Sequence, residues 1–164
     1  MWLYVNPTEF EKKIWFTVFE GARRAIEKLL RSAEDWSRTK MAIAETIANL
    51  ILSICRSVKF IAVVEFSGGE VVDHYEGGFD IDLLIETESP AEAYALKRLE
   101  PIMDNAIKEA ITYLKDKEFF RLMTSRYGKG FYHDVLELHV NDMCVEAMKR
   151  STTVHSISIL YRAT

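Results

Sequence analysis

KFIAVVEFSGGEVVDHYEGGFDIDLLIE, residues 59–86, contains the pattern that decides the fold. Its first eight residues are almost continuously apolar and predict a strand. A run of this kind is typical of a central strand that is covered on both faces. Gly68-Gly69 and Gly77-Gly78 then punctuate an acidic connection, and a second strand is predicted to begin at Asp80-Ile81-Asp82. The stretch therefore predicts two neighbouring strands joined by a glycine-rich connection.

Two aspartates are predicted to share one face at the mouth of the second strand. Successive side chains of a strand point to opposite faces, so Asp80 and Asp82 lie together while Ile81, Leu83 and Ile85 face the core. Two carboxylates side by side repel each other unless a cation lies between them. Asp80 and Asp82 are therefore candidate cation ligands.

The flanking sequence predicts one α/β (α+β) domain over residues 1–164, with helices packed on one face of a mixed sheet. Capping residues predict three helix starts, at Thr8, at Ser32 or Asp35, and at Ser89-Pro90. Pro101 predicts a kink or a break in the third helix. Helices are predicted over residues 8–31, 32–57, 90–116 and 118–123, and strands over residues 59–66, 80–86, 131–140 and 152–162. The first two helices form a predicted hairpin, residues 1–57, on the core of residues 58–164, and the last strand is predicted at an edge.

The third predicted strand offers another carboxylate. Alternation places Leu136 and Leu138 on its core side and Glu137 on the opposite side. If this strand neighbours the second one, Glu137 joins Asp80 and Asp82. Asp134 supplies the third carboxylate instead if the register of the third predicted strand is shifted by one residue. Ligand sets made of oxygen alone suit Mg²⁺ or Mn²⁺.

Histidines leave a second kind of site open. His74, His133 and His139 lie in or near the same predicted strands and connection. Imidazole nitrogens combined with carboxylates suit Zn²⁺, Mn²⁺ or iron, which is typical of metal-dependent hydrolases.

The combination of Gly68-Gly69, ten intervening residues and Asp80-Ile81-Asp82 resembles the nucleotidyltransferase superfamily, which has the DNA polymerase β-like fold, in its minimal form. The resemblance covers about residues 58–140. It implies transfer of a nucleoside monophosphate from an NTP to a hydroxyl acceptor by a two-metal mechanism. The implied ligands of Mg²⁺ (or Mn²⁺) are Asp80, Asp82 and Glu137. Gly68 and Gly69 are the implied phosphate-binding turn, with Gly69 in the place of the family's serine.

The same stretch also departs from the family. No lysine or arginine occurs between Lys59 and Lys97, so basic residues from elsewhere are needed to neutralise a triphosphate. Arg121, Arg126 and Lys129, in a predicted glycine-punctuated loop, are the candidates. An alternative expectation is a catalytically inactive member of the fold that serves as a binding or assembly module. Its N-terminal helices would then contact a protein partner or a second copy of the chain.

Composition sets the remaining expectations. Apolar residues make up 49% and charged residues 28% of the 164 residues, which is typical of a globular domain. A formal net charge of −4 does not favour nucleic acid as a partner. Cys55 and Cys144 form no CxxC motif, and no signal peptide or membrane-length apolar run is seen. These features predict a cytoplasmic protein with reduced thiols and no membrane partner.

Overall fold

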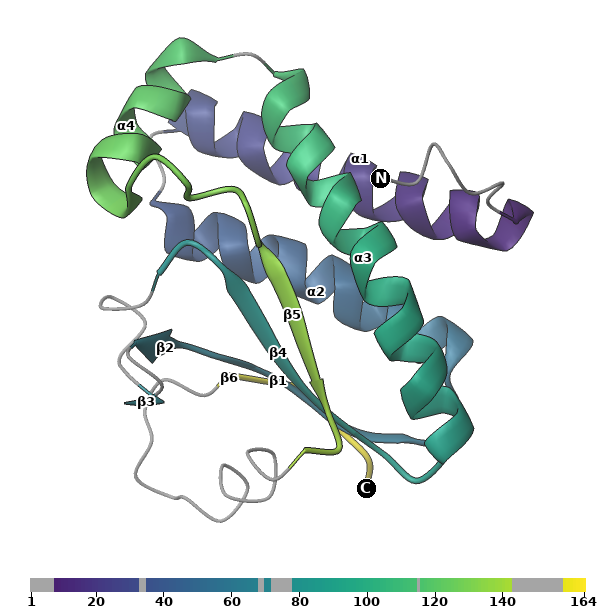
Figure 1. The fold of residues 1–164 in the computed structure, drawn as a ribbon. Coiled ribbons are helices and arrows are strands. Elements are labelled where there is room, and N and C mark those ends of the chain that lie inside the picture. The colour runs from purple at the N-terminus through teal and green to yellow at the C-terminus, as the bar shows by residue number, and fades with distance from the viewer. Residues whose placement is uncertain (1–7, 33–34, 68–69, 72–77, 115, 143–157) are drawn as a thin grey trace.

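The computed structural model describes residues 8–32, 35–67, 70–71, 78–114, 116–142 and 158–164. It is a mixed α and β fold, as the sequence predicts (Figure 1). The helices are α1 Glu9–Ser32, α2 Trp36–Ile54, α3 Pro90–Tyr113 and α4 Lys117–Tyr127. The strands are β1 Val58–Val64, β2 Phe66–Ser67, β3 Glu70–Val71, β4 Ile81–Thr87, β5 Leu136–Val140 and β6 Ser158–Arg162. Across the described part of the chain, no helix combines the length and the apolarity needed to cross a membrane.

Four strands form a mixed sheet in the order β5-β4-β1-β6. β1 runs antiparallel to β4 and to β6, whereas β4 and β5 run parallel. The predicted central place of β1 is confirmed, and so is the edge position of the last strand. β2 and β3, which lie between β1 and β4 in the sequence, pair with each other in a separate antiparallel sheet.

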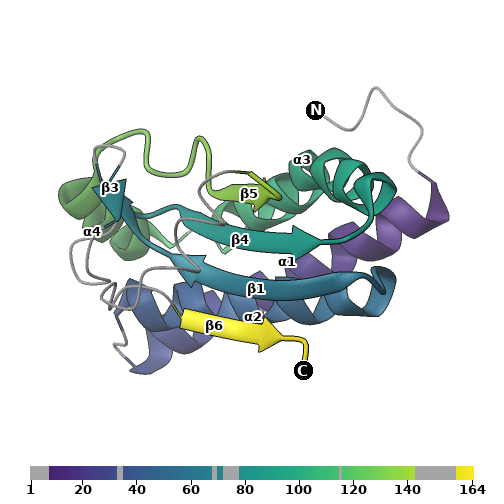
Figure 2. The ribbon, with the colours of Figure 1, turned by 90° about the horizontal axis from the view of Figure 1, so that it is seen from below.

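Two layers of helices stack on one side of the sheet (Figures 1 and 2). Ile61, Leu83 and Leu138 belong to the core that the sheet shares with the helices. α2 and α3 lie on this face, and α1 packs across them on the side away from the sheet. Gly21 permits close contact between α1 and α2, because a Cβ atom there would lie 2.6 Å from Thr46 Cγ2. In the predicted hairpin of the two N-terminal helices, α2 contacts the sheet, and α1 forms the outer layer.

Local capping explains where the helices begin. Thr8, Asp35 and Ser89 accept hydrogen bonds from backbone N–H groups three residues later, at 3.1, 3.1 and 3.2 Å. These three predicted caps are confirmed. Asp116 caps α4 in the same way, at 2.9 Å from the Phe119 nitrogen. The helix predicted over residues 118–123 is therefore confirmed but is longer than predicted, because α4 spans Lys117–Tyr127.

The predicted third strand is shorter than expected. Residues 131–135 lie outside β5, where N–H groups of Phe131 and His133 bond the carbonyls of Gly128 and Gly130 in successive turns. Gly128 has φ 95°, a conformation that glycine adopts without strain. These turns carry the chain from the end of α4 back to the sheet.

The outer edge of β5 is covered by side chains of α3. Glu100 accepts from the Leu138 N–H at 2.7 Å, and Asp104 accepts from Val135 and Leu136 N–H groups, both at 2.9 Å. These carboxylates replace a missing neighbour strand, because they satisfy donors that an edge strand leaves open. They also anchor α3 on both sides of Pro101, which the helix passes without a break.

We expect Asp104→Ala to lower the free energy of unfolding by about 2–3 kcal/mol. The substitution leaves two backbone donors of β5 without their charged acceptor. Urea unfolding at neutral pH measures the change, with Glu109→Ala as the control. Glu109 is exposed on the same helix, so its replacement should cost no more than about 0.5 kcal/mol. Equal stability of the two variants would show that α3 does not support the edge of β5.

Candidate metal centre

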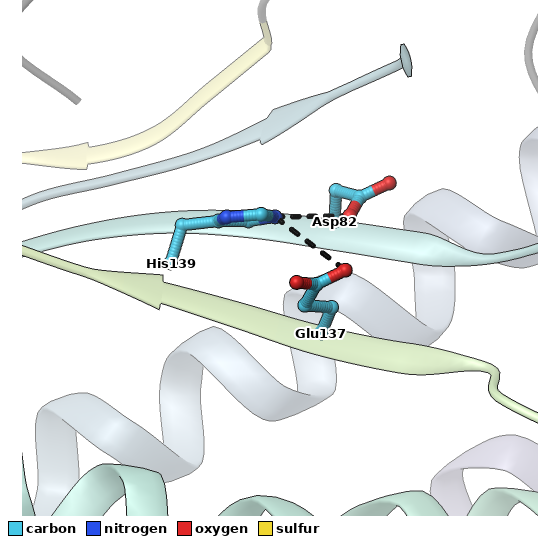
Figure 3. Close-up of side chains that lie close together, drawn as sticks. All are labelled: Asp82, Glu137 and His139. Carbon is cyan, nitrogen blue, oxygen red and sulfur yellow. Dashed lines mark hydrogen bonds and ion pairs between the residues drawn. The ribbon is translucent and has the colours of Figure 1, made fainter. Parts of the chain in front are cut away.

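Asp82, Glu137 and His139 converge on the sheet face that points away from α2 and α3 (Figure 3). Parallel pairing of β4 with β5 sets Asp82 opposite Glu137 and Leu84 opposite His139. Because Ile81 alternates with Asp82 and faces the core, all three polar side chains share the other face. Of the predicted carboxylates Asp80, Asp82 and Glu137, the structure thus brings Asp82 and Glu137 together.

The histidine links the carboxylates of this group. His139 Nε2 lies 3.0 Å from Asp82 Oδ1 and 4.0 Å from Glu137 Oε2. Its other ring nitrogen, Nδ1, lies 3.3 Å from Asp142 Oδ2. The Asp82 side chain is 8% exposed, that of His139 15% and that of Glu137 62%. The group therefore extends from a buried carboxylate to one that solvent reaches.

Asn141 turns the chain so that Asp142 faces His139. It has φ 56°, in the left-handed region that asparagine tolerates better than most residues. Its side chain accepts from the Thr87 N–H at 2.8 Å and donates to the Thr87 carbonyl at 3.0 Å. The end of β5 is thereby fixed to the end of β4.

The carboxylates around His139 favour its protonated form. Its hydrogen bond to Asp82 raises the pKa of the imidazole above 6.5, against the lowering effect of burial. The negative charges of Asp82, Glu137 and Asp142 raise the pKa of this imidazole further. Three carboxylates thus surround the imidazole of His139.

In EDTA, we expect His139 to stabilise the protein most at mildly acidic pH. Because the folded-state pKa is raised, its contribution is fully present below pH 6.5 and is lost as the pH rises through the folded-state pKa. The difference in unfolding free energy between wild type and His139→Gln should therefore shrink from pH 6 to pH 9. Urea titrations along this range measure it, with His133→Gln, an exposed histidine, as the control. A difference that stays constant or grows with pH would contradict this prediction.

The three side chains can hold a metal ion. Each offers one ligand atom, and these atoms all lie within 4.8 Å of one another. Three protein ligands leave coordination positions open for water or substrate, as in catalytic rather than structural sites. Coordination through Nε2 would require the neutral form of His139, because histidine coordinates metals as the neutral imidazole.

Asp80 lies beside the group but outside it. β4 begins at Ile81, so Asp80 precedes the strand and its side chain is exposed. It lines a pocket of about 300 Å³ together with Tyr127, His133 and Asp134. Gly78 leaves room for this carboxylate, since a Cβ atom there would lie 3.1 Å from Asp80 Oδ1. Of the two candidates for the third carboxylate, Glu137 therefore lies opposite Asp82, whereas Asp134 lines the same pocket as Asp80.

The predicted phosphate-binding residues have different surroundings. Arg121 belongs to α4, pairs with Glu118 at 2.5 Å and lines a separate groove with Leu29 and Leu30. Arg126 stacks over the Tyr127 ring, 5.4 Å from its centroid, at the end of α4. Lys129 is exposed in the following turn and directly precedes Gly130, which lines the Asp80 pocket. Gly68, Gly69 and His74 lie outside the described residues.

Two features near the site were not predicted from the sequence. Asp142 follows the end of β5, and no periodicity points to it. Lys40 and Glu65 form a buried ion pair next to Gly78, with N–O distances of 2.8 Å. A signal for this pair does exist in the sequence. Glu65 interrupts an apolar strand, and Lys40 falls on the apolar stripe of its helix, so each needs a buried partner.

No protein-family model matches this chain, and the comparisons with curated proteins and with solved structures return no match either.

Proposed function

We propose that this chain is a nucleotidyltransferase that uses a divalent cation, Mg²⁺ or Mn²⁺, to transfer a nucleoside monophosphate from an NTP to a hydroxyl acceptor. The observation that carries the proposal is the in-register placement of Asp82 and Glu137 on neighbouring parallel strands. The Asp80-Ile81-Asp82 pattern at the mouth of β4 supports the same assignment.

The residues of the centre have distinct tasks in this proposal. Asp82 and Glu137 hold the cation, whose charge stabilises the transferring phosphate. Asp80, exposed at the adjoining pocket, completes the ligand set when the nucleotide brings its own cation. Arg126 and Lys129 are close enough in sequence to the pocket wall at Tyr127 and Gly130 to contact the outer phosphates.

The reaction forms one bond and breaks another. The acceptor oxygen attacks the α-phosphorus, and the bond from that phosphorus to the bridging oxygen of pyrophosphate breaks. The hydroxyl proton passes to a carboxylate of the group. Glu137 is the best placed, because its side chain is the most exposed of the three.

A second candidate is a hydrolase of phosphate esters with a single metal ion. The observation that favours it is His139, whose nitrogen belongs to the same group as the two carboxylates. A mixed set of nitrogen and oxygen donors suits Mn²⁺, Zn²⁺ or Fe²⁺ better than Mg²⁺. In this case water would take the place of the acceptor hydroxyl.

Cation preference and reaction products test the two candidates together. Calorimetric titrations of the EDTA-treated protein with Mn²⁺, Mg²⁺ and Zn²⁺ measure affinity, and melting temperatures with and without ATP measure nucleotide binding. A nucleotidyltransferase should bind Mn²⁺ and gain further stability from ATP in its presence. Separation of the nucleotide products should show release of pyrophosphate, and a panel of hydroxyl compounds should raise that rate.

The outcomes separate the candidates. Zn²⁺ binding with phosphate release from simple esters, and without a stabilising effect of ATP, favours the hydrolase. Both candidates would be refuted if none of the three cations changed the melting temperature of the wild-type protein and His139→Ala gave the same result.

A further inference from the structure

Two side chains of α2 hold the backbone that leads into β4. Trp36 Nε1 donates to the Phe79 carbonyl at 2.8 Å, and Lys40 Nζ donates to the Gly78 carbonyl at 2.7 Å. Trp36 and Lys40 lie four residues apart, so both point from the same face of the helix. The two consecutive carbonyls that they bind come directly before Asp80.

Lys40 also binds the other end of the connection between β1 and β4. Glu65 follows the last residue of β1, and both of its carboxylate oxygens lie 2.8 Å from Lys40 Nζ. With the Gly78 carbonyl, these oxygens use all three donors of the ammonium group. Lys40 thus joins residues 65 and 78, which flank the connection.

These contacts are buried or partly buried. The side chains of Lys40 and Glu65 are 4% and 3% exposed, and Trp36 is buried as well. The Trp36 ring stacks on that of Phe79, with centroids 4.0 Å apart and planes 9° apart. Phe79 packs in turn against Phe131, at 4.8 Å between ring centroids. Hydrogen bonds to the carbonyls of residues 78 and 79 and ring packing of Phe79 therefore hold this backbone in place.

Stability alone gives no reason for an ion pair at this place. Desolvation of two charges offsets most of their attraction, and a well-packed apolar pair is often equally stable or better. A directional contact of Lys40 with the Gly78 carbonyl, by contrast, is something that an apolar side chain does not provide. This contact holds the Gly78 carbonyl just before the start of β4, the strand whose register with β5 sets Asp82 opposite Glu137.

We propose that Trp36, Lys40 and Glu65 are positioning residues of the metal centre. They touch neither the cation nor the substrate, and they act by holding Asp82 where Glu137 and His139 meet it. The part of this inference that concerns metal affinity rests on the proposed function.

Two variants test the inference with little loss of packing. Trp36→Phe keeps an aromatic ring against Phe79 and removes the donor to its carbonyl. Lys40→Met combined with Glu65→Leu removes both charges at once, so that no buried charge is left unpaired. Val18→Ala, a substitution in the buried stripe of α1, serves as the control for a general loss of core stability.

Two measurements are made below the unfolding transition of every variant. The first is Mn²⁺ affinity by calorimetry, where Trp36→Phe and the double variant should each bind about tenfold more weakly than wild type. The second is amide hydrogen exchange at residues 81–83, which should become about tenfold faster in both variants. Val18→Ala should match wild type in Mn²⁺ affinity.

The outcomes keep this inference apart from the proposed function. If wild type binds neither Mn²⁺ nor Mg²⁺, the proposed function fails, and hydrogen exchange still decides whether these residues position β4. If wild type binds Mn²⁺ and both variants bind it equally well, the inference is refuted while the proposed function stands. Unchanged exchange at residues 81–83 in both variants refutes the inference in either case.

Discussion

Asp82→Asn is expected to weaken Mn²⁺ binding by at least about a hundredfold and to lower pyrophosphate release from ATP by about a thousandfold. Asparagine keeps the size of the side chain and an oxygen that His139 can still approach. It removes the one negative charge of the group that is shielded from water. Calorimetry of the EDTA-treated variant and a pyrophosphate assay at saturating Mn²⁺ measure the two effects.

Asp80→Asn is the informative comparison, because Asp80 lies outside the three-residue group. In the absence of nucleotide it should bind Mn²⁺ with nearly wild-type affinity, and its loss should be confined to the rate in the presence of ATP. Asp82→Asn should lose both. If the two variants behave alike without nucleotide, or if Asp82→Asn retains wild-type affinity, the assignment of the buried carboxylate as the principal ligand is wrong.

Local rules in the sequence predict most of the framework around this centre. The helix starts follow from Thr8, Asp35 and Ser89, because an N-cap needs one side-chain oxygen and no distant partner. Alternation in β4 correctly separates Ile81 and Leu83 from Asp82, because the period of a strand is fixed by its backbone. Both kinds of inference depend on residues only a few positions apart.

The composition of the site depends on pairing between distant segments. Alternation predicts that Glu137 and His139 share a face, but only the parallel register of β4 with β5 places Glu137 opposite Asp82. A shift of one residue would reverse the faces, so sequence alone left Asp134 as an alternative. The start of β4 at Ile81 likewise separates Asp80 from the group, although the residue pattern treats the two aspartates alike.

The interaction of Lys40 with Glu65 shows the same limit in a stronger form. The two residues are 25 positions apart, and each belongs to an element that is otherwise predicted by its apolar pattern. A charge in an apolar stripe indicates that some partner exists, but it does not indicate which one. Hydrophobic patterning thus locates the helix and the strand, while the contact that joins them emerges from packing.

Lys40→Met is expected to lower the free energy of unfolding by about 3–5 kcal/mol, because it leaves the Glu65 carboxylate buried without its cation. This loss is a large part of the 5–15 kcal/mol that is usual for a folded domain. It should reduce the melting temperature by on the order of 10 °C. Lys40→Met combined with Glu65→Leu should recover most of the loss, since no charge then remains buried alone. Urea unfolding of wild type and both variants at neutral pH measures these differences.

The double variant decides between two explanations of a large effect. If the cost comes from an unpaired charge, the double variant should lie within about 2 kcal/mol of wild type, the remainder reflecting the Gly78 carbonyl that has lost its donor. If the cost comes from lost packing around the lysine stem, the double variant should be at least as unstable as Lys40→Met. Recovery of stability without recovery of Mn²⁺ affinity would separate the two roles of the pair. The charges would then be dispensable for folding, and their geometry would be needed to set Asp82 against Glu137.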